Sequence, residues 1–188
     1  MINELLSKAI EKNDAKGINE LFKSGVDINS KDTDGDTPLL LAIGEGNINA
    51  AQILFELGAA TNSTNNEGLS VLHVAAYSGS LRSVEFALSK LIDINSKDNE
   101  GMTALHHSVE SEDVDVFEFL IKSEAEKNVV DNDGWSILHL AADKGSRFFV
   151  KRLIEIGVNL ELKTSKGNTA ADLARLKNDD EILKLFHF

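Results

Sequence analysis

Residues 68–79 read GLSVLHVAAYSG, residues 101–112 read GMTALHHSVESE, and residues 134–145 read GWSILHLAADKG. Each stretch begins 33 residues after the previous one, and a related stretch, GDTPLLLAIGEG, occupies residues 35–46. The glycine that opens each stretch returns once more at Gly167, so the register holds over five cycles. A sequence period of about 20 to 50 residues is typical of a chain built from stacked structural repeats.

Each repeat predicts two short helices. A Thr or Ser two residues after the opening glycine is a good helix N-cap, and Pro38 stands at a first helical position, where its missing N–H costs nothing. Apolar residues then recur at helical spacing, as at Leu39 and Ala42. Gly46 ends the first helix, and a second apolar stretch follows at residues 48–55. Because two helices of about ten residues cannot bury their apolar faces alone, neighbouring repeats must stack.

The start of the first helix carries a motif typical of one repeat family. It stands as Thr37-Pro38-Leu39-Leu40, Ser70-Val71-Leu72-His73, Thr103-Ala104-Leu105-His106 and Ser136-Ile137-Leu138-His139. With the 33-residue period, it resembles the T-P-L-H-x-A signature of the ankyrin repeat along the whole chain. The resemblance implies an all-α ankyrin-repeat solenoid of stacked helix-turn-helix units with hairpin-like turns, in a single domain over residues 1–188. We expect six units, the first and last being capping units: 1–31, 32–64, 65–97, 98–130, 131–163 and 164–188.

The composition excludes several classes of function. Lys and Arg number 19 against 31 Asp and Glu, and the resulting net charge of −12 disfavours nucleic acids and anionic membrane surfaces as partners. The absence of Cys excludes disulfides and thiolate chemistry. Neither a signal peptide nor an apolar run of transmembrane length is found, so a cytoplasmic location is expected, with the nucleus as a second possibility. The family resemblance implies a monomer.

Three histidines, His73, His106 and His139, recur at the repeat spacing. Stacked units keep equivalent residues roughly 10 Å apart, so these rings cannot converge on one metal ion. The family resemblance implies that each ring instead forms local hydrogen bonds that hold its turn. The acidic stretch at residues 32–36 lacks the calcium-loop pattern, because its glycine comes fourth rather than sixth. We therefore predict no catalytic residue, no metal site and no cofactor, and we do not expect an enzyme.

The positions that vary between repeats are candidates for partner binding. In the ankyrin family these are the turn tips, the residue after the turn glycine and the last residues of the first helix, which line the concave face. Leu69, Met102 and Trp135 share one such position, so we expect a continuous exposed apolar ridge, with Tyr77 on the same face. The charged residues expected around this ridge are Asp34, Asp36, Glu45, Glu67, Glu100, Glu110, Asp133, Asp143 and Lys144.

Aromatic anchors inside a polar rim are typical of protein-binding hot spots, and an acidic rim steers basic partners. The hypothesis is a non-enzymatic protein–protein interaction module. It binds a basic or basic-apolar segment of another protein on its concave face and acts by scaffolding or occlusion. The alternative is a structural or regulatory subunit of a larger assembly. That subunit would dock through its outer helices at Phe148, or through its C-terminal end at Phe186 and Phe188.

The third full unit, residues 99 to 131, departs from the glycine pattern. Glu112 and Glu124 stand where other repeats have glycine, and a non-glycine residue in the left-handed backbone region costs roughly 1 kcal/mol. Three acids within residues 110–113 add like-charge repulsion. We predict that this unit is the softest part of the array, with the fastest amide exchange among the internal units. Hydrogen-exchange mass spectrometry checks this, and finding it the most protected unit would contradict it.

Overall fold

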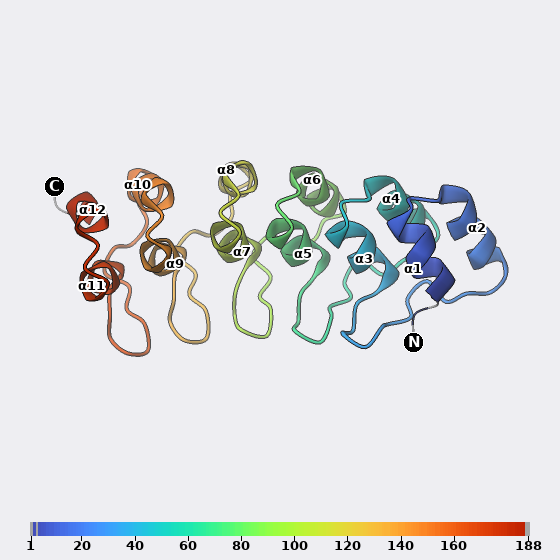
Figure 1. Ribbon diagram of the computed structural model, residues 1–188, viewed down its shortest axis with the longest axis horizontal. Helices are drawn as coiled ribbons and strands as arrows, with labels where there is room; N and C mark the ends of the chain where they lie inside the picture. The colour runs from blue at the N-terminus through green and yellow to red at the C-terminus, as the bar shows by residue number, and fades with distance from the viewer. Residues whose placement is uncertain (1, 3, 187–188) are drawn as a thin grey trace.

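The computed structural model describes residues 2 and 4–186. In that part of the chain, twelve α-helices form six pairs that stack in sequence order (Figure 1). The first helices of the pairs are α1 (Glu4–Glu11), α3 (Pro38–Gly44), α5 (Val71–Tyr77), α7 (Ala104–Glu110), α9 (Ile137–Lys144) and α11 (Ala170–Leu176). The second helices are α2 (Ala15–Lys23), α4 (Ile48–Glu56), α6 (Leu81–Ser89), α8 (Val114–Lys122), α10 (Arg147–Glu155) and α12 (Asp180–Leu183), which the 3-10 turn Lys184–Phe186 follows. The predicted all-α solenoid of helix-turn-helix units is confirmed.

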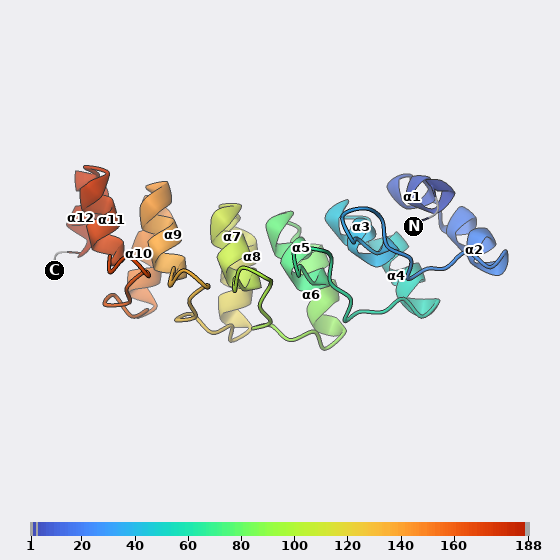
Figure 2. The same ribbon diagram turned by 90° about the horizontal axis from the view of Figure 1, so that it is seen from below.

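The stack has two rows of helices and one row of turns. In Figure 1 the first helices lie between the second helices above and the long turns below, and Figure 2 shows the array from the side of the turns. Each of the first helices α3, α5, α7 and α9 packs against the first helices of both neighbouring pairs, and the terminal α1 and α11 pack against one. The turns and the first helices therefore share one surface, which we call the inner face.

Local sequence signals set the helix starts as predicted. The backbone N–H of Leu40 donates to Thr37 Oγ1 at 3.3 Å, and Pro38 occupies the first turn of α3. Ser70 and Ser136 form capping boxes, in which a histidine three residues later accepts the N–H of the capping residue. Side-chain caps of this kind satisfy N–H groups that the first helical turn leaves without partners.

The hydrophobic core runs through the stack rather than through any one pair. The leucine of the family motif is fully or almost fully buried at Leu39, Leu72, Leu105 and Leu138. Between α8 and α10 the rings of Phe117 and Phe149 meet edge to face, with centroids 5.1 Å apart. In the described part of the chain, no helix is both long and apolar enough to cross a bilayer.

Five exposed residues of the described chain other than glycine adopt the left-handed backbone conformation that glycine holds elsewhere in the array: the asparagines Asn13 and Asn178, whose side chains tolerate it, and Leu91, Glu112 and Glu124. Leu91, Glu112 and Glu124 have φ of 59°, 58° and 65°. The equivalent Gly58 and Gly46 have φ of 93° and 67°. The repeat therefore imposes its backbone geometry even where the side chain disfavours it, and Leu91 is left 94% exposed.

Replacing these residues by glycine tests the strain. We expect Glu112→Gly and Glu124→Gly each to raise the free energy of unfolding by about 1 kcal/mol, because they relieve the left-handed strain. Urea denaturation followed by circular dichroism measures the change. Glu126→Gly is the matched control, since Glu126 is exposed and has no positive φ, and it should destabilise the protein. Equal effects in all three variants would contradict the expectation.

Candidate functional site

In the turns of the inner face, a polar side chain at the start of the turn accepts hydrogen bonds from backbone N–H groups later in the same turn. Asn65 Oδ1 accepts the backbone N–H groups of Glu67 and Leu69 at 3.1 and 2.9 Å. Asp98 Oδ1 accepts those of Glu100 and Met102, both at 2.9 Å. Because the same two bonds recur in successive turns, the tip acid and the residue after the glycine keep the same placement in each repeat.

Backbone hydrogen bonds also join successive turn tips. The N–H of Asn66 donates to the carbonyl of Asp34 at 3.0 Å, and the N–H of Asn99 donates to that of Glu67 at 3.0 Å. The Asn66 side-chain amide adds a second bond, to the Thr33 carbonyl at 2.9 Å. The tip asparagines, which the sequence suggests as partner contacts, thus use their amides to hold the turns together. The tips form a ladder with a fixed step.

Glycine is required where one turn approaches the next. Gly35 has φ of 81°, and a Cβ there would lie 2.7 Å from the backbone nitrogen of Asn66. The same closeness recurs between Gly68 and Asn99. The invariant register of these glycines therefore follows from the contact between neighbouring turns.

Two adjoining pockets hollow the inner face. The first, of about 420 Å³, lies between the second and third helix pairs, and the second, of about 460 Å³, between the third and fourth. They share the residues Glu67, Leu69 and Tyr77, which form the wall between them. We call the two pockets together the acidic groove. Its lining consists of Asp34, Asp36, Leu40, Leu41, Gly44, Glu45, Asn65, Asn66, Glu67, Leu69, Val74, Tyr77, Asp98, Asn99, Glu100, Met102, His107 and Glu110.

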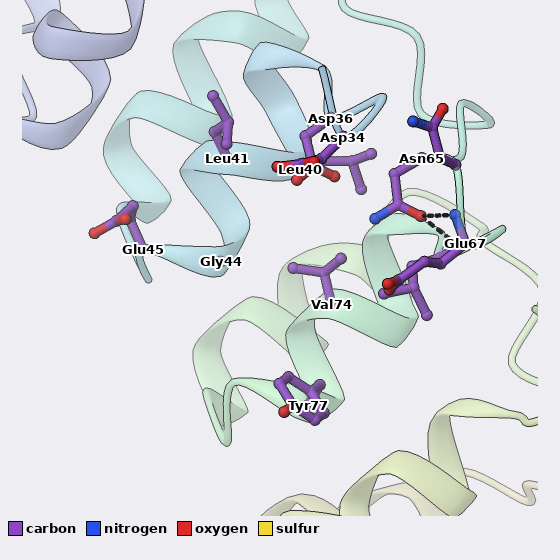
Figure 3. Close-up of a pocket in the computed structure, with 12 residues that line it drawn as sticks. Asp34, Asp36, Leu40, Leu41, Gly44, Glu45, Asn65, Glu67, Val74 and Tyr77 are labelled. Carbon is purple, nitrogen blue, oxygen red and sulfur yellow. Dashed lines mark hydrogen bonds between the residues drawn. The ribbon is translucent and has the colours of Figure 1, made fainter. Parts of the chain in front are cut away.

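Carboxylates crowd the first pocket. Figure 3 shows Asp34 and Asp36 together on the turn before α3, with Glu67 on the next turn and Tyr77 at the end of α5. Burial raises the pKa of Asp36, and the nearby charges of Asp34 and Glu67 raise it further. Its Oδ1 atom is sealed from solvent and makes no hydrogen bond. The pocket therefore carries more negative charge than its own polar groups compensate.

A buried hydrogen bond between side chains supports the second pocket. His107 Nε2 lies 2.8 Å from Asp98 Oδ2, and the two side chains are only 8% and 3% exposed. His107 Nδ1 faces Glu110 Oε2 at 3.5 Å but makes no hydrogen bond. The ring of Tyr77 meets that of His107 edge to face, with centroids 6.1 Å apart. His107 thus links the turn to the aromatic wall of the groove.

Most of the predicted partner-binding residues gather in the groove. Nine of them line the two pockets: Asp34, Asp36, Glu45, Glu67, Leu69, Tyr77, Glu100, Met102 and Glu110. Tyr77 is 61% exposed and stands at their common wall. The expectation of a continuous exposed ridge is wrong at Met102, which is only 6% exposed. Its turn tucks the side chain into the base of the second pocket, so the apolar surface is interrupted between Leu69 and Trp135.

The other four predicted residues lie beyond the two pockets. Trp135 is half-buried, and its ring contacts that of His139 at 6.1 Å. Asp143 pairs with Lys177 of the last helix pair at 2.7 Å, a base that the sequence analysis did not include. Asp133 and Lys144 are exposed. This end of the inner face is more nearly balanced in charge than the groove.

The three repeated histidines form local bonds, as the resemblance implied. His73 Nδ1 accepts the N–H of Ser70 at 3.1 Å, and its Nε2 bonds the carbonyl of Ser96 at 2.9 Å. His139 makes the same two kinds of contact. His106 accepts the N–H of Thr103 at 3.2 Å, but its Nε2 has no hydrogen-bond partner. Burial lowers the pKa of His106 to about 4.

The sequence analysis missed the groove residues that come from the first helices and the turn closures. His107 is the clearest case, because it lies outside the turn tips, the positions after the turn glycines and the ends of the first helices. The available signal was its register, since Leu41, Val74 and Leu140 occupy the same position in other repeats. A single titratable residue at a repeat position that is otherwise apolar indicates that its side chain makes a polar contact that the other repeats lack. Asp98, its partner, has no such signal.

Stacked helix pairs with a groove along their turns define the protein as a solenoid repeat protein. The model of the family described as ankyrin repeats (3 copies) matches residues 6–98, 58–131 and 105–187. The chain belongs to the ankyrin repeat family. Proteins of this family are generally protein–protein interaction modules and are typically non-enzymatic. No relative among curated proteins matches the chain.

The buried His106 makes stability depend on pH. Its pKa falls from 6.5 to about 4 on folding, so the stabilisation is complete above pH 6.5 and is lost as pH falls toward 4. Between about pH 7 and about pH 4.5, we expect wild type to lose about 2 kcal/mol more stability than His106→Leu. Leucine is the natural occupant of this position at Leu40. Urea denaturation at several pH values measures the difference, and parallel pH profiles would contradict it.

Proposed function

We propose that the protein binds a basic, partly apolar segment of another protein in the acidic groove, and acts by scaffolding or occlusion without catalysing a reaction. The observation that carries this proposal is the composition of the groove. No Lys or Arg of the described chain lines the groove. Seven residues with carboxylate side chains line it: Asp34, Asp36, Glu45, Glu67, Asp98, Glu100 and Glu110. Such a surface attracts cationic segments and repels phosphate.

The groove also offers apolar contact area. Leu69 and Tyr77 stand between the two pockets, and Leu41 and Val74 line the first one. An exposed aromatic ring surrounded by polar groups is typical of an interface hot spot. Because the turn ladder and the helix stack fix these side chains before a partner arrives, little ordering free energy opposes binding.

Peptides selected from a random dodecapeptide library on the wild-type protein test this proposal. We expect enrichment of Arg or Lys together with apolar residues. Tyr77→Ala should weaken the selected peptides by about thirtyfold, the loss typical of a 2 kcal/mol hot spot. Phe148→Ala is the matched control, since Phe148 is an aromatic residue of α10 that is 48% exposed outside the groove. Selection of acidic peptides would overturn the proposal.

The salt dependence gives a second test. Raising the salt from about 20 mM to about 150 mM should lower the association rate constant about tenfold, because screening weakens electrostatic steering. The dissociation rate constant should change much less. Stopped-flow fluorescence with a selected peptide measures both rates. An association rate constant that stays the same at both salt concentrations would show that the carboxylates do not steer the partner.

A second candidate function is docking into a larger assembly through the outer helices. Phe148 favours it, because this large apolar side chain stays half exposed on α10 while its ring packs edge to face on Phe149 at 5.3 Å. Phe186 gives less support, since it is partly buried against the core. Phe188 lies outside the described residues. Loss of partner binding in Phe148→Ala, with binding retained in Tyr77→Ala, would favour this candidate.

A further inference from the structure

The two pockets of the acidic groove repeat the same design one unit apart. Each has a turn-tip acid at its rim, Glu67 or Glu100, and each opens toward the ring of Tyr77. The turn ladder sets their separation, because the tip of each turn is bonded to the next through backbone N–H groups. A partner segment that fills both pockets must match this separation. The groove therefore constrains the partner's sequence spacing as well as its charge.

Each pocket also contains a buried polar atom without a partner. In the first it is Asp36 Oδ1, and in the second it is Nδ1 of His107, whose side chain is 8% exposed. His107 Nε2 bonds the Asp98 carboxylate at 2.8 Å, and Glu110 Oε2 lies 3.5 Å from Nδ1. Neither pocket is lined by a Lys or Arg side chain, so the carboxylates of both pockets face no cationic donor of the described chain. An arginine side chain supplies five N–H donors and a positive charge.

The separation selects a backbone conformation for the partner. Adjacent helices pack about 8–10 Å apart, and this is the step from one pocket to the next. In a polyproline II segment, residues i and i+3 point the same way and lie about 9 Å apart. In a β-strand, residues on one face lie about 7 Å or about 13 Å apart, which fits neither one step nor two. The ring of Tyr77 at the common wall adds the aromatic surface on which polyproline II segments pack.

We propose that the acidic groove recognises a polyproline II segment that carries two arginines three residues apart, one in each pocket. This inference rests on the proposed function and specifies its partner. One guanidinium lies against Asp34 and Asp36 in the first pocket. The other lies between Glu100 and Glu110 in the second. The two residues between the arginines cross the wall formed by Leu69 and Tyr77.

A series of fluorescent proline-based peptides tests the spacing. The peptides carry two arginines separated by one, two or three prolines, and binding is measured by anisotropy. The peptide with two intervening prolines should bind at least about tenfold more tightly than the others, because only it places both arginines on one side. Equal binding of all three peptides, lost in Tyr77→Ala, would overturn the spacing but leave the proposed function standing. Binding by none of them would overturn the inference.

A double-mutant cycle then tests the two pockets separately. Asp34→Asn removes charge from the first pocket and Glu100→Gln from the second, and both residues are exposed, so folding should survive. Each variant should lose about tenfold in affinity for the matched peptide. Replacing the arginine of the same pocket by glutamine should cost each variant less affinity than it costs wild type, and replacing the arginine of the other pocket should cost the same as in wild type. Glu85→Gln, an exposed acid on α6, is the control and should bind as wild type does. Additive losses at both arginines would contradict one arginine per pocket.

Discussion

The contact between neighbouring repeats is the constraint on which the rest of the structure depends. No helix pair has enough apolar surface to fold alone, so each first helix is buried only when the next pair is in place. The same translation brings each turn tip against the following one, where backbone N–H and carbonyl groups pair. Gly35 and its equivalents permit this approach because a Cβ would collide with the next turn. Helix packing and the hydrogen bonds between turns thus impose the same spacing between neighbouring repeats.

Because this spacing is constant, residues at equivalent repeat positions form a continuous surface. Side chains 33 residues apart are presented side by side, so the tip acids Asp34, Glu67 and Glu100 face one groove despite lying in separate repeats. The electrostatic cost of crowding carboxylates is visible at Asp36, whose pKa is raised by burial and by its acidic neighbours. A partner with the opposite charge relieves that cost, which is the physical basis for the proposed binding.

The stacked array also accommodates residues that depart from the repeat's sequence pattern. Glu112 and Glu124 take a left-handed backbone because the stack on either side fixes their positions. Arg147 replaces an apolar residue at the start of α10, and it is accommodated by an ion pair with Glu181 of the next repeat at 2.9 Å. Such departures occur from the first capping unit, at Asn13, to the last, at Asn178. They set where the array differs from an ideal solenoid.

The sequence by itself determined the fold, since period, caps and apolar spacing are local signals that repeat in register. It also placed Asp34, Glu67 and Tyr77 on the inner face, because equivalent positions in a solenoid share a face. Tertiary structure alone decided that Met102 is buried, that the groove has two pockets, and that His107 pairs with Asp98. The bond between His107 and Asp98, for example, forms because the turn that carries Asp98 folds back against α7, nine residues later in the chain. Spacing along the chain does not encode that approach, so only the packed structure reveals it.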